Sequence, residues 1–178
     1  MQIFNSLNRY GLVAILLHWI MALILIGLIG LGLYMTRIPI SLLKLKLYGW
    51  HKEIGLLALM LVIARFIWRL INQNPLLPFE MPQWEKFAAR LVHRMFYIVM
   101  FLLPISGWFL TSAAGLPASF FGWFVLPDII GPNETHRLFL TQIHNSLGYL
   151  LIGLLGLHTA AALKHHFINK DDILRRML

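Results

Sequence analysis

The sequence contains no cysteine among its 178 residues. This absence excludes disulfide bonds, iron–sulfur ligation, cysteine-based zinc sites and thioether-attached haem, which needs a C-x-x-C-H segment. Charged residues are also scarce, at 12%, whereas apolar residues make up 59% of the chain; a soluble domain is about one quarter charged and one half apolar. The composition argues against an ordinary soluble enzyme or a disordered chain, and it favours a protein whose solvent is lipid.

Acidic residues number only 7 against 15 lysines and arginines, so the formal net charge is +8. Basic charge can indicate a nucleic-acid partner. Here the basic residues fall between long apolar runs, where membrane headgroups are their natural partners. We therefore expect membrane lipid, and no nucleic acid, as a partner.

Four stretches are long and apolar enough to cross a bilayer, which takes about 20 residues. We expect spans at about 12–35, 47–70, 91–113 and 138–163, within a single domain over 1–178. The second is the weakest, because Lys52, Glu53, Arg65 and Arg69 leave it a short uncharged centre. The first is too long for a signal peptide, and Pro104 predicts a kink in the third. The expected fold is an all-α integral membrane protein, a four-helix transmembrane bundle.

The distribution of lysine and arginine predicts the orientation. With the N-terminus inside, ten basic residues lie on the inner face: Arg9, Arg65, Arg69, Lys86, Arg90, Arg94, Lys164, Lys170, Arg175 and Arg176. Four lie on the outer face, namely Arg37, Lys44, Lys46 and Arg137, with Lys52 at the border. The positive-inside rule then places both termini in the cytoplasm.

Histidines are the informative residues, because an ionisable side chain inside a span indicates function. His18, His51, His144 and His158 all lie within expected spans. His144 and His158 share nearly one face of the fourth span but lie about 21 Å apart along its axis, so no single metal ion can touch both. By depth, His18 pairs with His158 near one membrane surface, and His51 pairs with His144 near the other.

Small residues follow each of these histidines four positions later, beside it on the same helical face. They are Ala22, Gly55, Gly148 and Ala162. A flat macrocycle set edge-on to a helix needs such a gap, and bis-histidine b-type haem fits this pattern best. Two other interpretations stay open: histidines that hydrogen-bond across helices, and a histidine-based proton or metal-ion transporter. A transporter would more naturally carry acidic residues within its spans, where Glu53 is the only candidate.

Five segments carry a family resemblance: LLHW (16–19), WHKEIG (50–55), LLPISG (102–107), HNSLGY (144–149) and GLHTAAALKHHF (156–167), the last followed by KDDILRRM. With them the chain resembles the bacterial cytochrome b561 family along nearly its whole length, including the superoxide-oxidising members. The resemblance implies a four-helix membrane cytochrome with two haem b groups. It also implies electron transfer from superoxide to ubiquinone, and the same axial pairs, His18 with His158 and His51 with His144.

Three further sets of candidate residues follow from this hypothesis, although no catalytic residue is predicted. A basic outer face would steer superoxide, a small anion; the candidates are Arg37, Lys44, Lys46, Lys52 and Arg137. Ubiquinone would need hydrogen-bond partners and protons near the inner face; the candidates are His93, Lys164, His165 and His166. Haem propionates would need cations; the candidates are Arg65, Arg69 and Arg9. Headgroup contact explains any one of these basic residues equally well.

We therefore expect an oxidoreductase of the bacterial inner membrane that oxidises periplasmic superoxide to O₂ and reduces ubiquinone. The alternative is a haem b subunit that carries electrons between quinone and a separate redox partner protein.

Overall fold

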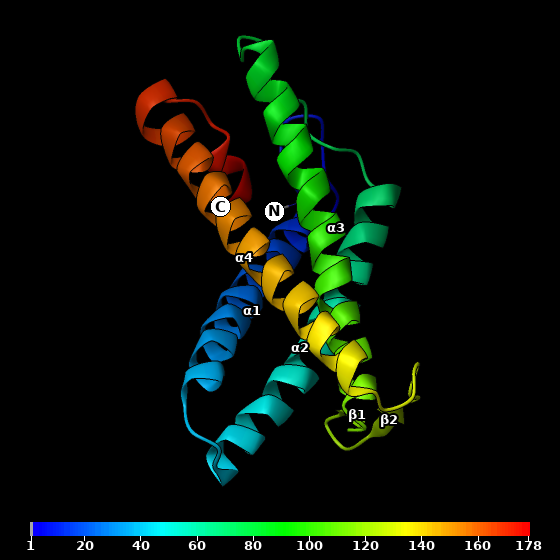
Figure 1. The fold of residues 1–178 in the computed structure, drawn as a ribbon. Helices are drawn as coiled ribbons and strands as arrows, with labels where there is room; N and C mark the ends of the chain where they lie inside the picture. The colour runs from blue at the N-terminus through cyan, green and yellow to red at the C-terminus, as the bar shows by residue number, and fades with distance from the viewer. Residues whose placement is uncertain (1) are drawn as a thin grey trace.

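The computed structural model describes residues 2–178, and it is dominated by four long helices (Figure 1). They are α1 (Leu12–Arg37), α2 (Leu42–Ile71), α3 (Gln83–Ala113) and α4 (Glu134–Lys164). All four are long and apolar enough to cross a membrane. The expected fold class, an all-α transmembrane bundle, is confirmed.

Each expected span lies inside one of these helices, but three of the helices begin earlier than the apolar runs do. For α2 and α4 the reason is local capping. Ser41 accepts a hydrogen bond from the backbone N–H of Lys44 at 3.2 Å, and Asn133 accepts one from that of His136 at 3.0 Å. These N-caps start α2 and α4 within polar sequence, because a helix end needs hydrogen-bond partners rather than apolar residues.

The helices pack as an antiparallel bundle in which α1 lies along α2, α2 along α3 and α3 along α4. Its centre is a small cluster of buried side chains: Met21, Val62, Val99, Met100, Leu151 and Leu154. Large apolar side chains also point outward, and Leu23 on α1 is 69% exposed. An apolar surface of this extent is typical of helices that face lipid.

A short hairpin departs from the all-helical expectation. Strand β1 (Ala118–Phe120) pairs antiparallel with β2 (Phe124–Leu126). Its turn has positive φ at Phe121 and Gly122, as type I′ turns require. The hairpin lies in the connection between α3 and α4, and its first strand packs against α2 and α3.

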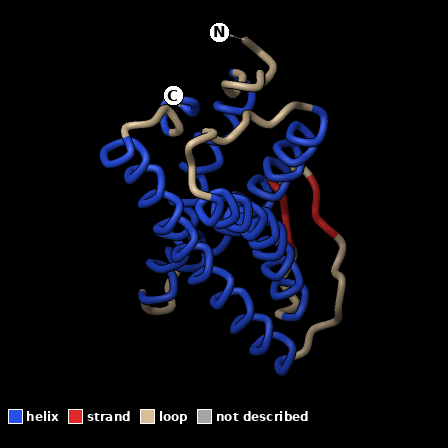
Figure 2. The backbone as a smooth tube through the Cα atoms, turned by 90° about the horizontal axis from the view of Figure 1, so that it is seen from above, coloured by secondary structure: helices blue, strands red, loops and turns tan. Residues whose placement is uncertain are grey.

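At the opposite end, the two ends of the chain lie on the same side of the molecule (Figure 2). The backbone N–H of Leu76, between α2 and α3, donates to the carbonyl of Leu7 at 2.8 Å. The indole N–H of Trp19 donates to the carbonyl of Met177 at 2.7 Å. Met177 ends the 3₁₀ helix η2 (Leu174–Met177), which follows the π-helix η1 (His165–Asn169) at the end of α4.

Candidate functional site

The bundle brings four membrane histidines together as two pairs. His18 on α1 faces His158 on α4, with ring centroids 6.2 Å apart; we call this pair the terminal layer. His51 on α2 faces His144 on α4, with ring centroids 6.1 Å apart; we call this pair the hairpin layer. These are the pairs that depth along the helices predicts.

The spacing within each pair fits a metal centre between two imidazoles. An imidazole nitrogen binds a metal ion at about 2 Å, so two rings on opposite sides of one ion have centroids roughly 6 Å apart. Each layer supplies two protein ligands, and across residues 2–178 no group of three or more His, Cys, Asp or Glu forms a metal cage. Two axial imidazoles suit an iron whose remaining ligands come from a porphyrin.

Glycines accommodate the rings of the hairpin layer. An added Cβ at Gly32 of α1 would lie 3.3 Å from Cε1 of His51, and one at Gly107 of α3 would lie 3.2 Å from Cε1 of His144. By contrast, a Cβ at Gly55 or Gly148 would meet no heavy atom within 4 Å. The positions one turn after these histidines therefore have open space beside them, as a macrocycle edge requires.

The proton on His144 is placed by its neighbours. Its Nδ1 lies 3.1 Å from the carbonyl oxygen of Leu103 and 3.0 Å from Oγ of Ser106. Since a carbonyl oxygen only accepts, Nδ1 carries the ring proton and donates it, which leaves Nε2 free to bind a metal. The ring of His51 is not oriented in this way, because its buried Nδ1 has no hydrogen-bond partner within residues 2–178.

The terminal layer contains two further polar residues. The guanidinium of Arg65, on α2, donates from Nη2 to Nδ1 of His18 at 3.1 Å. The ring of His93, on α3, lies 5.5 Å from that of His158. Arg65 is half-buried and forms no ion pair with a carboxylate of the described chain. A half-buried cation beside a predicted ligand suits a cofactor that brings its own negative charge.

Of the other predicted propionate ligands, Arg69 lies one helical turn after Arg65 on α2, whereas Arg9 lies outside the helices. The guanidinium of Arg69 stacks over the ring of Tyr97 at 5.3 Å. Arg9 lies in the N-terminal segment and lines a cavity with Arg175 and Arg176. The sequence gives no local signal for that cluster, because the C-terminal segment reaches it only by folding back.

The predicted quinone residues separate into two levels. His93 belongs to the terminal layer, whereas Lys164 and His165 lie at the end of α4, where both face Glu85 of α3. Nζ of Lys164 is 2.7 Å from Oε1 of Glu85, and Nε2 of His165 is 3.6 Å from Oε2. Asp171 completes the group with Oδ2 at 2.6 Å from Nδ1 of His165.

His166 packs against Phe167, away from this group. Sequence reasoning missed Glu85 and Asp171. Antiparallel pairing of α3 with α4 would have found Glu85, because it precedes His93 by about as many residues as His165 follows His158.

The predicted superoxide-steering residues gather at the hairpin end, but several have partners. Nζ of Lys44 donates to the carbonyl of Ile38 at 2.9 Å, and Nζ of Lys52 donates to that of Pro117 at 3.0 Å. Arg137 forms an ion pair with Glu134 at 2.5 Å, which compensates its charge. Arg37 and Lys46 are exposed, and neither pairs with a carboxylate of the described chain.

Comparison with known proteins agrees with this architecture. A family model described as prokaryotic cytochrome b561 matches residues 9–178. Cytochrome b561 homolog 2 of Escherichia coli (strain K12) is 37% identical over 100% of this chain and 95% of its own length. Cytochrome b561 homolog 1 of the same strain is 30% identical, over 97% and 98% respectively. A protein of Yersinia pestis named probable superoxide oxidase CybB is 27% identical, over 96% of each chain.

Proposed function

Since the chain belongs to the prokaryotic cytochrome b561 family, whose members transfer electrons in bacterial membranes with haem b, we propose that it binds two haem b groups and oxidises superoxide with ubiquinone. The observation that carries this proposal is the pair of facing imidazoles in each of two layers. The family resemblance predicted from the sequence is confirmed, and so are the membrane location and the electron-transfer class.

His18 and His158 would hold one haem iron, and His51 and His144 the other. A haem held by two imidazoles would supply one-electron transfer. The residues around each pair set its environment. Ser106 and Leu103 orient His144, while Arg65 and Arg69 would neutralise the propionates in the terminal layer.

The overall reaction balances with two superoxide ions for each quinone. Each superoxide loses one electron and becomes O₂, and the quinone gains both electrons and two protons to become quinol. The two layers lie toward opposite ends of α4, because His144 and His158 are about 21 Å apart along its axis. An electron taken up near the hairpin end can thereby reach the opposite side of the membrane.

Superoxide would arrive at the hairpin end. The exposed cations Arg37 and Lys46, with Lys52 beside His51, make that end positive. A positive field raises the association rate of a small anion. The name of the Yersinia pestis relative, probable superoxide oxidase CybB, supports the same donor.

Quinone would be reduced at the terminal layer, where His93 lies beside His158. Its two protons must come from the adjacent aqueous side. His165 lies between Glu85 and Asp171, and its two ring nitrogens, one a donor and one an acceptor in the neutral ring, can relay a proton between them. Lys164 and His166 lie at the same end and offer further donors.

We further propose that the terminal side, meaning the side of the bundle with His18, His158 and both chain ends, faces the cytoplasm. The positive-inside rule supports this orientation, with ten lysines and arginines expected on the inner face and four on the outer. The hairpin end then faces the periplasm.

A haem b subunit that transfers electrons between quinone and a separate redox protein is the second candidate. The two Escherichia coli relatives, which are more similar to this chain than the Yersinia pestis protein, are named for the family without a substrate. The two candidates differ in whether the purified chain consumes superoxide by itself. A transporter without haem fits less well, since each layer offers an ion only two ligands and the chain belongs to a cytochrome family.

The deciding experiment uses the purified protein in nanodiscs with ubiquinone-1 and potassium superoxide. We expect two haem b groups per chain and one quinol formed for every two superoxide ions consumed. His18→Ala should reduce the haem content to one and stop quinol formation, whereas His136→Ala, at the exposed start of α4, should change neither. Two haems without superoxide-dependent quinol formation would favour the partner-dependent candidate, and a colourless protein would exclude both.

A further inference from the structure

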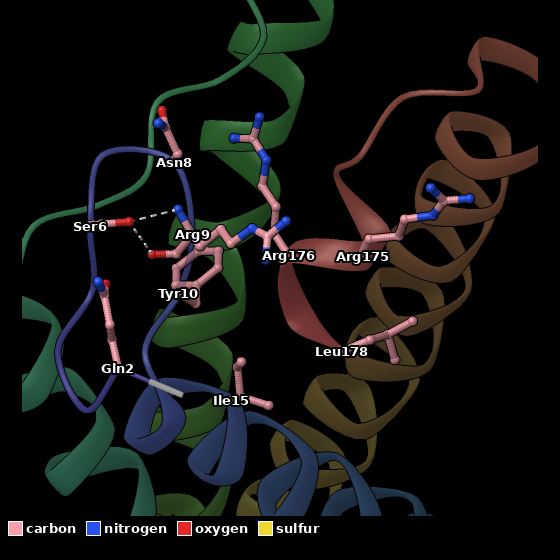
Figure 3. Close-up of a pocket in the computed structure, with 9 residues that line it drawn as sticks. All are labelled: Gln2, Ser6, Asn8, Arg9, Tyr10, Ile15, Arg175, Arg176 and Leu178. Carbon is pink, nitrogen blue, oxygen red and sulfur yellow. Dashed lines mark hydrogen bonds between the residues drawn. The ribbon is translucent and has the colours of Figure 1, made fainter.

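A cavity of about 640 Å³ lies on the terminal side, between the N-terminal segment and the C-terminal segment (Figure 3). Its walls include Ser6, Arg9 and Tyr10 from one end of the chain, and Arg175 and Arg176 from the other. It contains no residue of the two histidine pairs or of the predicted superoxide and quinone sets, and Arg9 is the one predicted propionate ligand in its lining.

The wall that carries Arg9 is fixed by a tight turn. The backbone N–H of Ser6 donates to the carbonyl of Arg9 at 2.9 Å, and the backbone N–H of Arg9 donates to Oγ of Ser6 at 3.1 Å. The Arg9 side chain extends from this turn toward that of Arg176 (Figure 3). Arginines that line one cavity repel each other unless an anion lies near them.

The arginines outnumber the carboxylates that could neutralise them. Arg176 is fully engaged: Nε and Nη2 donate to Oδ1 of Asp172 at 3.1 and 2.9 Å, and Nη1 donates to the carbonyl of Leu76. The bond from Arg176 holds the pKa of Asp172 below its ordinary value, and the charge of Arg9 adds to this to a smaller extent. Neither Arg9 nor Arg175 has a side-chain hydrogen bond or ion pair within residues 2–178. Within residues 2–178, Asp172 is therefore the one side-chain carboxylate that pairs with any of these three guanidinium groups, and it pairs with Arg176.

The cavity also lies where polar backbone meets apolar helix. Ile15 of α1 and Leu178 form its apolar wall, opposite the Ser6–Arg9 turn (Figure 3). Along α1 just beyond it, Leu16 and Trp19 are exposed, at 49% and 42%. Such a boundary is the depth at which lipid headgroups lie, with a surface beside it for acyl chains.

We propose that this cavity binds the phosphate of an anionic phospholipid from the adjacent leaflet, with Arg9 and Arg175 as its ligands and the acyl chains along α1. A guanidinium offers paired N–H donors that match phosphate oxygens, and basic pockets at this membrane face recognise anionic headgroups. A quinone headgroup is neutral and would gain little from uncompensated arginines. Haem propionates are better served by Arg65, which contacts His18 directly.

The bound lipid would join both ends of the chain. Arg9 belongs to the segment that leads into α1, and Arg175 to η2, whose Met177 carbonyl accepts the bond from Trp19, next to His18. A ligand that bridges these segments stabilises the folded protein in proportion to its occupancy. Lipid composition should therefore affect the stability of this end of the bundle.

The test measures binding of dioctanoyl-phosphatidylglycerol to the haem-loaded protein in a neutral detergent, by isothermal titration. Dioctanoyl-phosphatidylcholine has the same chains without net charge, and inorganic phosphate has the charge without chains. We expect phosphatidylglycerol to bind much more tightly than either. Arg9→Gln with Arg175→Gln should weaken phosphatidylglycerol binding at least about tenfold more than the matched control, Lys170→Gln with Arg94→Gln. The control removes the same amount of charge from the surface, and each generic surface charge changes the affinity for an anionic lipid by roughly fivefold.

Three results would overturn the proposal. Equal losses in the two double variants would show attraction to general surface charge only. Phosphate binding as tight as that of phosphatidylglycerol would show a site for a free anion. Equal binding of phosphatidylcholine would show that headgroup charge is irrelevant.

A measurement on the unmodified protein covers the case in which the double variant fails to fold. Phenylglyoxal modifies accessible arginines, and peptide mass spectrometry locates the sites. Phosphatidylglycerol should slow modification of Arg9 and Arg175 severalfold while leaving Arg94 unchanged. Equal protection of Arg94, or no protection at all, would contradict a defined site.

Discussion

Nη2 of Arg65 lies 3.1 Å from Nδ1 of His18, so a half-buried cation on α2 contacts a predicted iron ligand on α1. A guanidinium can only donate, so this contact places the imidazole proton on Nε2. To hold a haem iron through Nε2, His18 would need its proton on Nδ1 instead, where His144 carries it. Arg65 is thus expected to release His18 when haem binds and to turn to the haem's own negative charge.

Arg65→Gln should lower the reduction potential of the terminal-layer haem by roughly tens of millivolts, because a nearby positive charge favours the reduced form. The hairpin-layer haem should keep its potential. An optical redox titration resolves the two, and Arg65→Lys, which keeps the charge, serves as the control. A shift of both haems by the same amount would indicate a general structural change instead.

Gly32→Val should disturb the hairpin layer. A Cβ at this position lies 3.3 Å from Cε1 of His51, and overpacking of this kind typically costs about 1–3 kcal/mol. We expect a lower haem content with loss of the hairpin-layer signal in electron paramagnetic resonance. Gly30→Val is the matched control, since a Cβ at Gly30 would meet no heavy atom within 4 Å. Equal effects in the two variants would contradict the role of Gly32.

Superoxide consumption should depend on the uncompensated cations at the hairpin end. Arg37→Gln with Lys46→Gln should slow the second-order rate several-fold, up to about 10-fold, and flatten its dependence on ionic strength. Glu134→Gln with Arg137→Gln removes an ion pair without changing net charge, so its rate should stay near that of the unmodified protein. Pulse radiolysis at several salt concentrations measures both. A rate insensitive to salt in the unmodified protein would rule out steering.

Acid should loosen the C-terminal segment. The bond from Arg176 holds the pKa of Asp172 below its ordinary value of 3.8. The stabilisation is therefore complete above that value and is lost as pH falls through the lowered pKa. Hydrogen exchange of residues 170–178 should accelerate over this range, and in Asp172→Asn it should already be fast at neutral pH. Unchanged exchange in that variant would show that the ion pair does not hold the segment.

The features that the sequence predicts well follow from the geometry of each helix taken by itself. Apolar length locates the four membrane helices, and the rise per residue places His18 level with His158 and His51 level with His144. Small residues one turn after each histidine belong to the same periodicity. The imidazole pairing was therefore predictable before any contact between helices was known.

The remaining features depend on distant segments. The bond from Trp19 to Met177 and the cavity around Arg9 exist because the C-terminal segment folds back over the bundle. The group around His165 requires both the α3–α4 pairing and the wider π-helical turn at the end of α4. Strands as short as those of the hairpin carry too few residues for an alternating pattern to show.

Helix α4 contributes one imidazole to each layer, through His144 and His158. The separation between the two proposed haem irons would therefore be set by the covalent backbone of this one helix rather than by the positions of neighbouring helices in the bilayer. Lateral movements of α1 or α2 would change how each centre is clamped, yet the tunnelling distance between them would remain nearly constant. A bend in α4 itself is the deformation that would alter it.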